Sequence, residues 1–138
     1  MYLPSNLRDF QVELAGKLAI MDNPGQEVKA LRERYGFTQD WLAGLLRMRR
    51  ESLSRVESGH VSLSLNFIQR FTKIMTLARG VREHMAFVEA RGNPPDEAYL
   101  AMLAVGLRLD KETADEVTLV SQINYEQKRR SALRGLSK

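Results

Sequence analysis

The chain has no cysteine among its 138 residues. Disulfide bonds, thiolate metal ligands and cysteine nucleophiles are therefore excluded. No apolar stretch approaches the roughly 20 residues that a membrane-spanning helix needs. The opening residues, Met1–Ser5, lack the basic and apolar regions of a signal peptide. We therefore expect a cytoplasmic protein that does not enter a membrane.

The motifs of common enzyme sites are also missing. The sequence has no glycine-rich phosphate loop, no His-Glu-x-x-His motif and no paired histidine spacing. The two histidines, His60 and His84, are isolated in the sequence, and we expect His84 to be a surface or interface residue. The sequence thus predicts a protein that is not an enzyme and that binds neither a cofactor nor a metal. It does not identify any small-molecule effector.

Glycine, proline and alternating β-branched residues are all sparse, whereas apolar residues recur at helical spacing. We therefore predict an all-α fold. An N-terminal amphipathic helix is expected within residues 1–23, with Ser5 as its N-cap, and Pro24 suits the first turn of the next helix. A longer helix follows Ser64. The strongest helix-breaking sequence, Arg91–Pro95, predicts a domain or subdomain boundary.

Positive charge is concentrated in one block of the chain. Residues 29–79 contain ten Lys/Arg and four Asp/Glu, which gives +6, whereas the remainder contains eleven basic and thirteen acidic residues, which gives −2. Such a block favours a polyanionic partner, although a solvated charged surface explains the charge equally well.

Two short helices joined by a tight turn are predicted within this block. Thr38 is a good N-cap for the first helix, in which the small Ala43 allows close helix packing. In the second helix Leu53 and Val56 face inward, and Gly59 ends it. This arrangement describes a helix-turn-helix, and a helix fits the major groove of B-DNA. The side chains predicted to face double-stranded DNA are those of Thr38, Gln39, Arg47, Arg49, Arg50, Glu51, Ser52, Ser54, Arg55 and His60.

The same stretch resembles the helix-turn-helix of the phage repressor/Cro (XRE) family. The positions that match the family pattern are Arg32, Gly36, Thr38, Gln39, Leu42, Ala43, Leu53, Ser54, Arg55, Glu57 and Gly59. The resemblance implies a repressor-like five-helix domain over residues 24–90, with residues 49–57 as the recognition helix. It implies that Gln39 contacts a phosphate or a base edge, and that Arg32 and Glu57 form a structural pair. The opening residues of the chain also resemble the start of some archaeal regulators of this family.

Two residues depart from the family pattern near the turn. Arg47 stands where the family usually has glycine, and a positive φ is unfavourable for arginine. Arg49 replaces the usual Ser or Thr N-cap, so the recognition helix should begin without a side-chain acceptor. Both changes add positive charge to the predicted DNA face.

Residues 94–138 form a predicted C-terminal helical segment outside the minimal family domain. Its apolar stripes need a partner, which is either the rest of the chain or a second subunit, and we expect a homodimer. The last helix should begin near Asp110 or at Thr113, with Glu116 completing a capping box. The leading function is a sequence-specific transcription regulator, most often a repressor in this family. The alternatives are an antitoxin, a transcription bridging cofactor, or nonspecific DNA coating supported by the basic tail.

Overall fold

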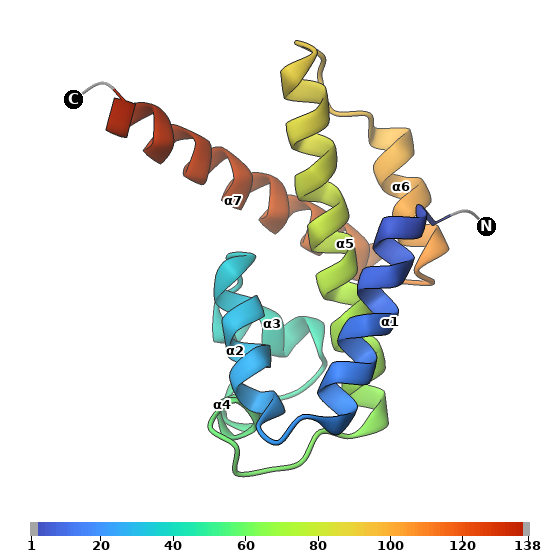
Figure 1. Cartoon of the computed structure of the whole chain (residues 1–138), viewed down its shortest axis with the longest axis vertical. Coiled ribbons are helices and arrows are strands. Elements are labelled where there is room, and N and C mark those ends of the chain that lie inside the picture. The colour runs from blue at the N-terminus through green and yellow to red at the C-terminus, as the bar shows by residue number, and fades with distance from the viewer. Residues whose placement is uncertain (1–2, 137–138) are drawn as a thin grey trace.

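The computed structural model describes residues 3–136, and over that range the chain is all-helical without a strand, which confirms the predicted fold class. Figure 1 shows the helices in chain order. They are α1 (Ser5–Ile20), α2 (Pro24–Arg34), α3 (Gln39–Leu45), α4 (Arg50–Glu57), α5 (Leu65–Ala90), α6 (Glu97–Gly106) and α7 (Lys111–Leu136). None of these helices is long and apolar enough to cross a membrane.

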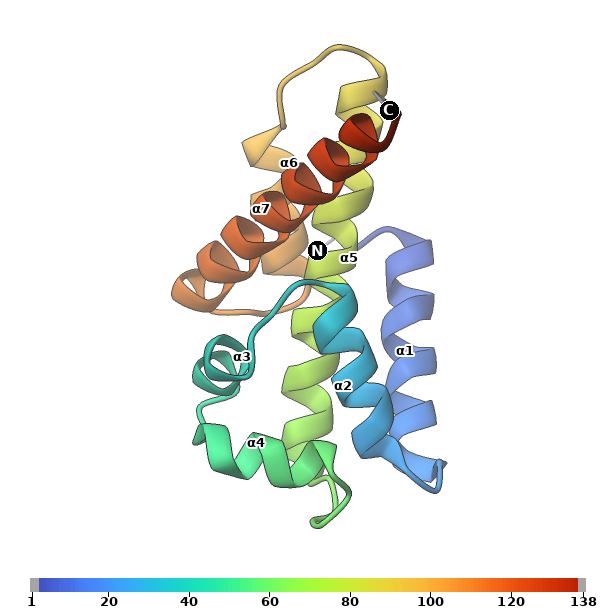
Figure 2. The same cartoon turned by 90° about the vertical axis from the view of Figure 1, so that its left-hand side faces the viewer.

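The long helix α5 lies at the centre, with α1, α6 and α7 packed around it and α2–α4 at one end (Figures 1 and 2). Its side chains Phe71, Ile74 and Met75 are fully buried. One hydrophobic core contains residues of all seven helices. The helices outside the helix-turn-helix segment therefore pack on the same core as the segment itself.

Residues 24–90 contain four helices instead of the five expected, because α5 runs without a break from Leu65 to Ala90. Ser64 caps this helix, with its hydroxyl accepting a hydrogen bond from the Phe67 N–H at 3.0 Å. Gly80 lies inside the helix, where a Cβ would come within 2.9 Å of the side chains of Leu7 and Leu103. Glycine here permits close approach of α1 and α6 and does not end the helix.

The predicted N-cap of the first helix is wrong by one residue, and of the two predicted starts of the last helix the one near Asp110 is confirmed. Helix α1 begins at Ser5, with Pro4 as its N-cap and no side-chain acceptor. Helix α7 begins at Lys111, and the Asp110 carboxylate accepts hydrogen bonds from both the N–H and the hydroxyl of Thr113. Asp110, rather than Thr113, therefore caps α7, since its carboxylate reaches the free N–H groups of the first turn. Pro24 does occupy the first turn of α2, as predicted.

His84, which was expected at the surface or at an interface, is buried between helices of the chain. Its imidazole is 8% exposed, stacks on the Tyr99 ring at 4.8 Å between centroids, and accepts a hydrogen bond from the Asp96 N–H at 2.8 Å. Asp96 is the N-cap of α6, so His84 fixes the start of α6 on α5. Burial lowers the pKa of His84, and the Asp96 carboxylate opposes this effect in part.

Candidate nucleic-acid interface

Helices α3 and α4 have the geometry expected of a helix-turn-helix. The Thr38 hydroxyl caps α3 by accepting a hydrogen bond from the Trp41 N–H at 3.0 Å. The inward side chains Leu42, Ala43 and Leu53 are at most 2% exposed. These contacts fix α4 on α3 and on the core, so the outer face of α4 has a defined orientation. Figure 2 shows α3 and α4 together at the lower end of the molecule.

The turn between the two helices contains a strained residue. Arg47 has a φ of +57°, a value that usually calls for glycine. Its N–H donates to the Gly44 carbonyl and the Met48 N–H donates to the Ala43 carbonyl, which closes the end of α3. The Arg47 guanidinium lies 3.6 Å from the Asp110 carboxylate, and both groups are well exposed. Arginine thus adopts the left-handed conformation and places a cation at the turn.

The start of α4 carries no side-chain cap. Arg49 is the N-cap in an extended conformation, and its side chain accepts no hydrogen bond from the helix. The N–H groups of the first turn therefore remain available to an external acceptor, and a phosphate at a helix start satisfies such groups.

The outer face of α4 is exposed and mostly basic. Arg49, Arg50 and Arg55 are exposed, together with Glu51 and Ser54. The predicted contact residue Ser52 is half-buried. Arg50 lies 3.8 Å from Asp40 of α3, but both side chains are more than 60% exposed. An exposed ion pair of this kind contributes little and leaves Arg50 free to exchange partners.

The inner end of α4 is fixed by a buried ion pair. Arg32 of α2 donates from Nε and Nη2 to the two carboxylate oxygens of Glu57, at 2.7 and 3.0 Å. Its Nη1 donates to the Phe37 carbonyl at 3.0 Å. Gln39 also donates its side-chain amide to Glu57, at 3.0 Å. In this arrangement Gln39, predicted as a DNA contact, supports the ion pair that joins α2, α3 and α4.

A second polar connection joins the helix-turn-helix to α7 and was not predicted. Arg70 of α5 donates from Nε to the Leu45 carbonyl at 2.6 Å and from Nη2 to the Thr113 hydroxyl at 2.8 Å. Its guanidinium also lies 3.6 Å from Asp110. Arg70 thereby holds the C-terminal end of α3, just before the strained turn, against the start of α7.

A third connection joins α7 to the C-terminal end of α2. Arg82 of α5 and Lys128 of α7 both donate to the Arg34 carbonyl, at 2.7 and 3.0 Å. Arg82 also donates to the Asn124 side chain at 2.8 Å. A Cβ at Gly36, whose φ is +82°, would lie 2.3 Å from Asn124. Cations favour the carbonyl end of a helix, so these contacts stabilise the junction of α2 and α3.

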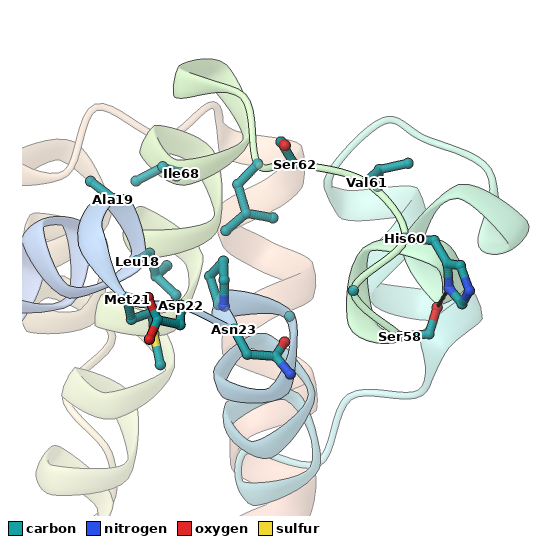
Figure 3. Close-up of a pocket in the computed structure, with 14 residues that line it drawn as sticks. Leu18, Ala19, Met21, Asp22, Asn23, Ser58, His60, Val61, Ser62 and Ile68 are labelled. Atoms are coloured by element: carbon teal, nitrogen blue, oxygen red, sulfur yellow. Dashed lines mark hydrogen bonds between the residues drawn. The ribbon is translucent and has the colours of Figure 1, made fainter.

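The loop after α4 borders an open cleft of about 570 Å³ between the end of α1 and the start of α2 (Figure 3). His60 lies on this loop, and its Nδ1 is 2.6 Å from the Ser58 hydroxyl. The ring of His60 is exposed just beyond α4, where it had been predicted to reach a phosphate. Among residues 3–136, no three His, Cys, Asp or Glu side chains are placed to hold a metal ion.

Residues 25–85, just under half of the chain, match the family model of a helix-turn-helix domain. Neither the comparison with curated proteins nor that with solved structures gave a match. The matched segment runs from the start of α2 into α5 and so contains α3, the turn and α4. Residues 25–85 are thus similar to a helix-turn-helix domain, in agreement with the arrangement of α3 and α4.

Proposed function

We propose that the chain is a sequence-specific transcription regulator of the repressor/Cro (XRE) type that inserts α4 into the major groove of double-stranded DNA. The observation that supports this proposal is the division of α4 into two faces. Leu53, Val56 and Glu57 are buried, whereas Arg50 and Arg55 are exposed. A helix fixed on one side and basic on the other is suited to reading base edges.

The exposed residues divide into two proposed roles. Arg50 and Arg55 pair with guanine O6 and N7, the commonest specific contact of arginine, and Glu51 accepts from a cytosine amino group. Ser52 and Ser54 bond to base edges or phosphates. A further set, at the start of α3, in the turn and just beyond α4, contacts the phosphate backbone and sets the register of the motif on the duplex. This set consists of Thr38, Gln39, Arg47, Arg49 and His60.

We further propose that the regulator is a cytoplasmic repressor that acts as a homodimer. One helix-turn-helix reads a short half-site, and specific binding at physiological salt usually needs two half-sites about one helical turn apart. Two copies related by a twofold axis would read a palindromic operator.

Selection of bound sequences from a random DNA pool tests sequence specificity. We expect a short palindrome, and Arg50→Ala and Arg55→Ala should each cost about 1–3 kcal/mol and relax preference at the contacted base. Arg49→Ala should weaken binding to all sequences and lower the salt slope by about 1. Arg91→Ala, at the exposed end of α5, is the charge-matched control and should change neither property.

An unchanged site preference in both Arg50→Ala and Arg55→Ala would show that α4 is not the recognition helix. A steep salt dependence without any preferred site would instead indicate nonspecific DNA coating. In the basic tail that this alternative needs, Lys128 bonds to the Arg34 carbonyl and Arg129 pairs with Glu89, which reduces the charge available to DNA. An antitoxin or a bridging cofactor would co-purify with a protein partner.

A further inference from the structure

The outer face of α7 carries a stripe of exposed apolar side chains. Leu119, Ile123 and Leu133 are 52%, 44% and 52% exposed. Val117 and Val120, at most 2% exposed, belong to the hydrophobic core. At about 100° per residue, the three exposed side chains lie on the side of α7 opposite these core residues. Figure 2 shows α7 lying across the surface of the molecule.

The stripe has the spacing of a coiled-coil seam. Residues 119, 123, 126, 130 and 133 are separated alternately by four and three positions, as the a and d positions of heptads are. The third and fourth of these positions are held by Glu126 and Arg130, one negative and one positive. A seam with an opposite-charge pair at its centre specifies the orientation of its partner more strongly than a purely apolar seam.

The C-terminal end of α7 extends beyond the body of the molecule. Residues 127–135 are all exposed, and Figure 1 shows this end of the helix pointing away from α2–α4 and from α5. The end of a helix frays readily when few contacts hold it. A second helix laid along the seam would supply such contacts.

We propose that this seam is the interface with a second copy of the chain, in which the two α7 helices pair antiparallel about a twofold axis near residue 128. In this register Ile123 faces Leu133 of the second copy, and Glu126 faces Arg130 of the second copy. Twofold symmetry makes each of these contacts twice. A parallel pair would instead place Glu126 against Glu126 and Arg130 against Arg130, which is unfavourable.

The inference deepens the proposed function, because it names the surface that would bring two recognition helices together. Association is measured without DNA, so a failure of the dimer is distinguishable from a failure of DNA binding. The seam residues are far from α4 in the sequence, and the variants below leave Arg50 and Arg55 unchanged.

Sedimentation of the full chain over a range of concentrations tests the pairing. We expect the wild type to dimerise, and Glu126→Arg and Arg130→Glu to weaken dimerisation by about tenfold each, because each reversal creates two like-charge contacts. The double reversal should restore dimerisation, since opposite charges again face each other. Ile123→Glu should abolish it. Glu13→Arg, an equal charge change at an exposed site on α1, is the matched control and should have no effect.

A wild type that stays monomeric at the highest concentration overturns the proposal. So does a dimer that Glu126→Arg and Arg130→Glu affect no more than Glu13→Arg does, because another surface would then mediate association. Failure of the double reversal to restore the dimer would exclude the antiparallel register. Circular dichroism checks that each variant keeps its helix content.

Discussion

Glu57, at the end of α4, is a buried carboxylate that depends on hydrogen bonds from other helices. Its carboxylate is 6% exposed and receives hydrogen bonds from Arg32 and Gln39. Burying a carboxylate is costly unless a cation and further donors satisfy it. Glu57 is also the last residue of α4. The contacts that satisfy its charge therefore also fix the orientation of α4.

Removal of Arg32 should therefore be strongly destabilising. We expect Arg32→Ala to lower the free energy of unfolding by about 3–5 kcal/mol, because the substitution leaves the Glu57 charge buried without a cation. Gln39→Ala should cost less, about 1.5–3 kcal/mol, since it removes one hydrogen bond to the charged group. Urea denaturation followed by circular dichroism measures both losses.

The ion pair of Lys17 and Glu27, whose side chains are 56% and 19% exposed, provides the control for this prediction. Because the cation lies mostly in water, Lys17→Ala should change the free energy of unfolding by about 1 kcal/mol or less. Equal losses in Arg32→Ala and Lys17→Ala would show that the burial of Glu57 carries no energetic penalty in this protein.

At the scale of helices and turns, two arginines adopt the same unusual conformation. Arg47 follows α3 and Arg108 follows α6, and both have a φ of +57°. In each turn the N–H of the arginine and that of the next residue close the helix end, by donating to carbonyls of its last turn. The left-handed conformation costs about 1–2 kcal/mol for a residue other than glycine. The two positions therefore form a matched pair, one at the candidate DNA face and one away from it.

Replacing either arginine by glycine should stabilise the chain. We expect Arg47→Gly and Arg108→Gly to raise the free energy of unfolding by about 0.5–1 kcal/mol each, since relief of strain exceeds the added entropy of the unfolded chain. Only Arg47→Gly should weaken DNA binding and lower the salt slope, by about 1. Thermal denaturation and DNA titrations at several salt concentrations measure these effects. Equal DNA affinities in the two variants would show that the Arg47 side chain does not contribute to DNA binding.

The sequence predicted where helices occur better than where they begin. Thr38 and Pro24 were placed correctly because one residue at each position has the required chemistry. The N-cap of α1 is Pro4, which has no side-chain acceptor, so no polar residue identifies that helix start. At the start of α7, both Asp110 and Thr113 have side chains that suit an N-cap. The reason for a glycine at position 80 lies outside the local sequence, because its close contacts come from Leu7 and Leu103, which are distant in the chain.

At the scale of the whole molecule, the contacts that join the parts of the chain were beyond sequence reasoning. The exposed face of α4 follows from helical periodicity alone. The hydrogen bonds of Arg70 to Leu45 and of Lys128 to Arg34 span 25 and 94 residues, so no local sequence pattern predicts them. They connect α5 and α7 to the carbonyl ends of α3 and α2. The C-terminal helix is thereby part of the support for the helix-turn-helix, as well as a candidate interface.

His84 links the stability of the whole chain to pH. Burial lowers its pKa below the ordinary value of about 6.5. The ordinary value applies to the unfolded chain and the lowered value to the folded chain. Between these two pKa values the folded chain thus binds fewer protons than the unfolded chain. The contribution of the neutral His84 ring to the free energy of unfolding is therefore fully present above about pH 6.5, and it is lost as the pH drops through this window. Protonation also turns the ring nitrogen that accepts from the Asp96 N–H into a donor, which opposes that hydrogen bond.

We expect the free energy of unfolding of the wild type to decrease between pH 7.5 and pH 5.5, and His84→Gln to lose the part of this slope that histidine contributes. The glutamine oxygen can still accept from the Asp96 N–H, but it does not titrate in this range. Urea denaturation at several pH values distinguishes the two proteins. Identical slopes in His84→Gln and the wild type would exclude His84 as the titrating group, because the carboxylates and the other histidine are common to both.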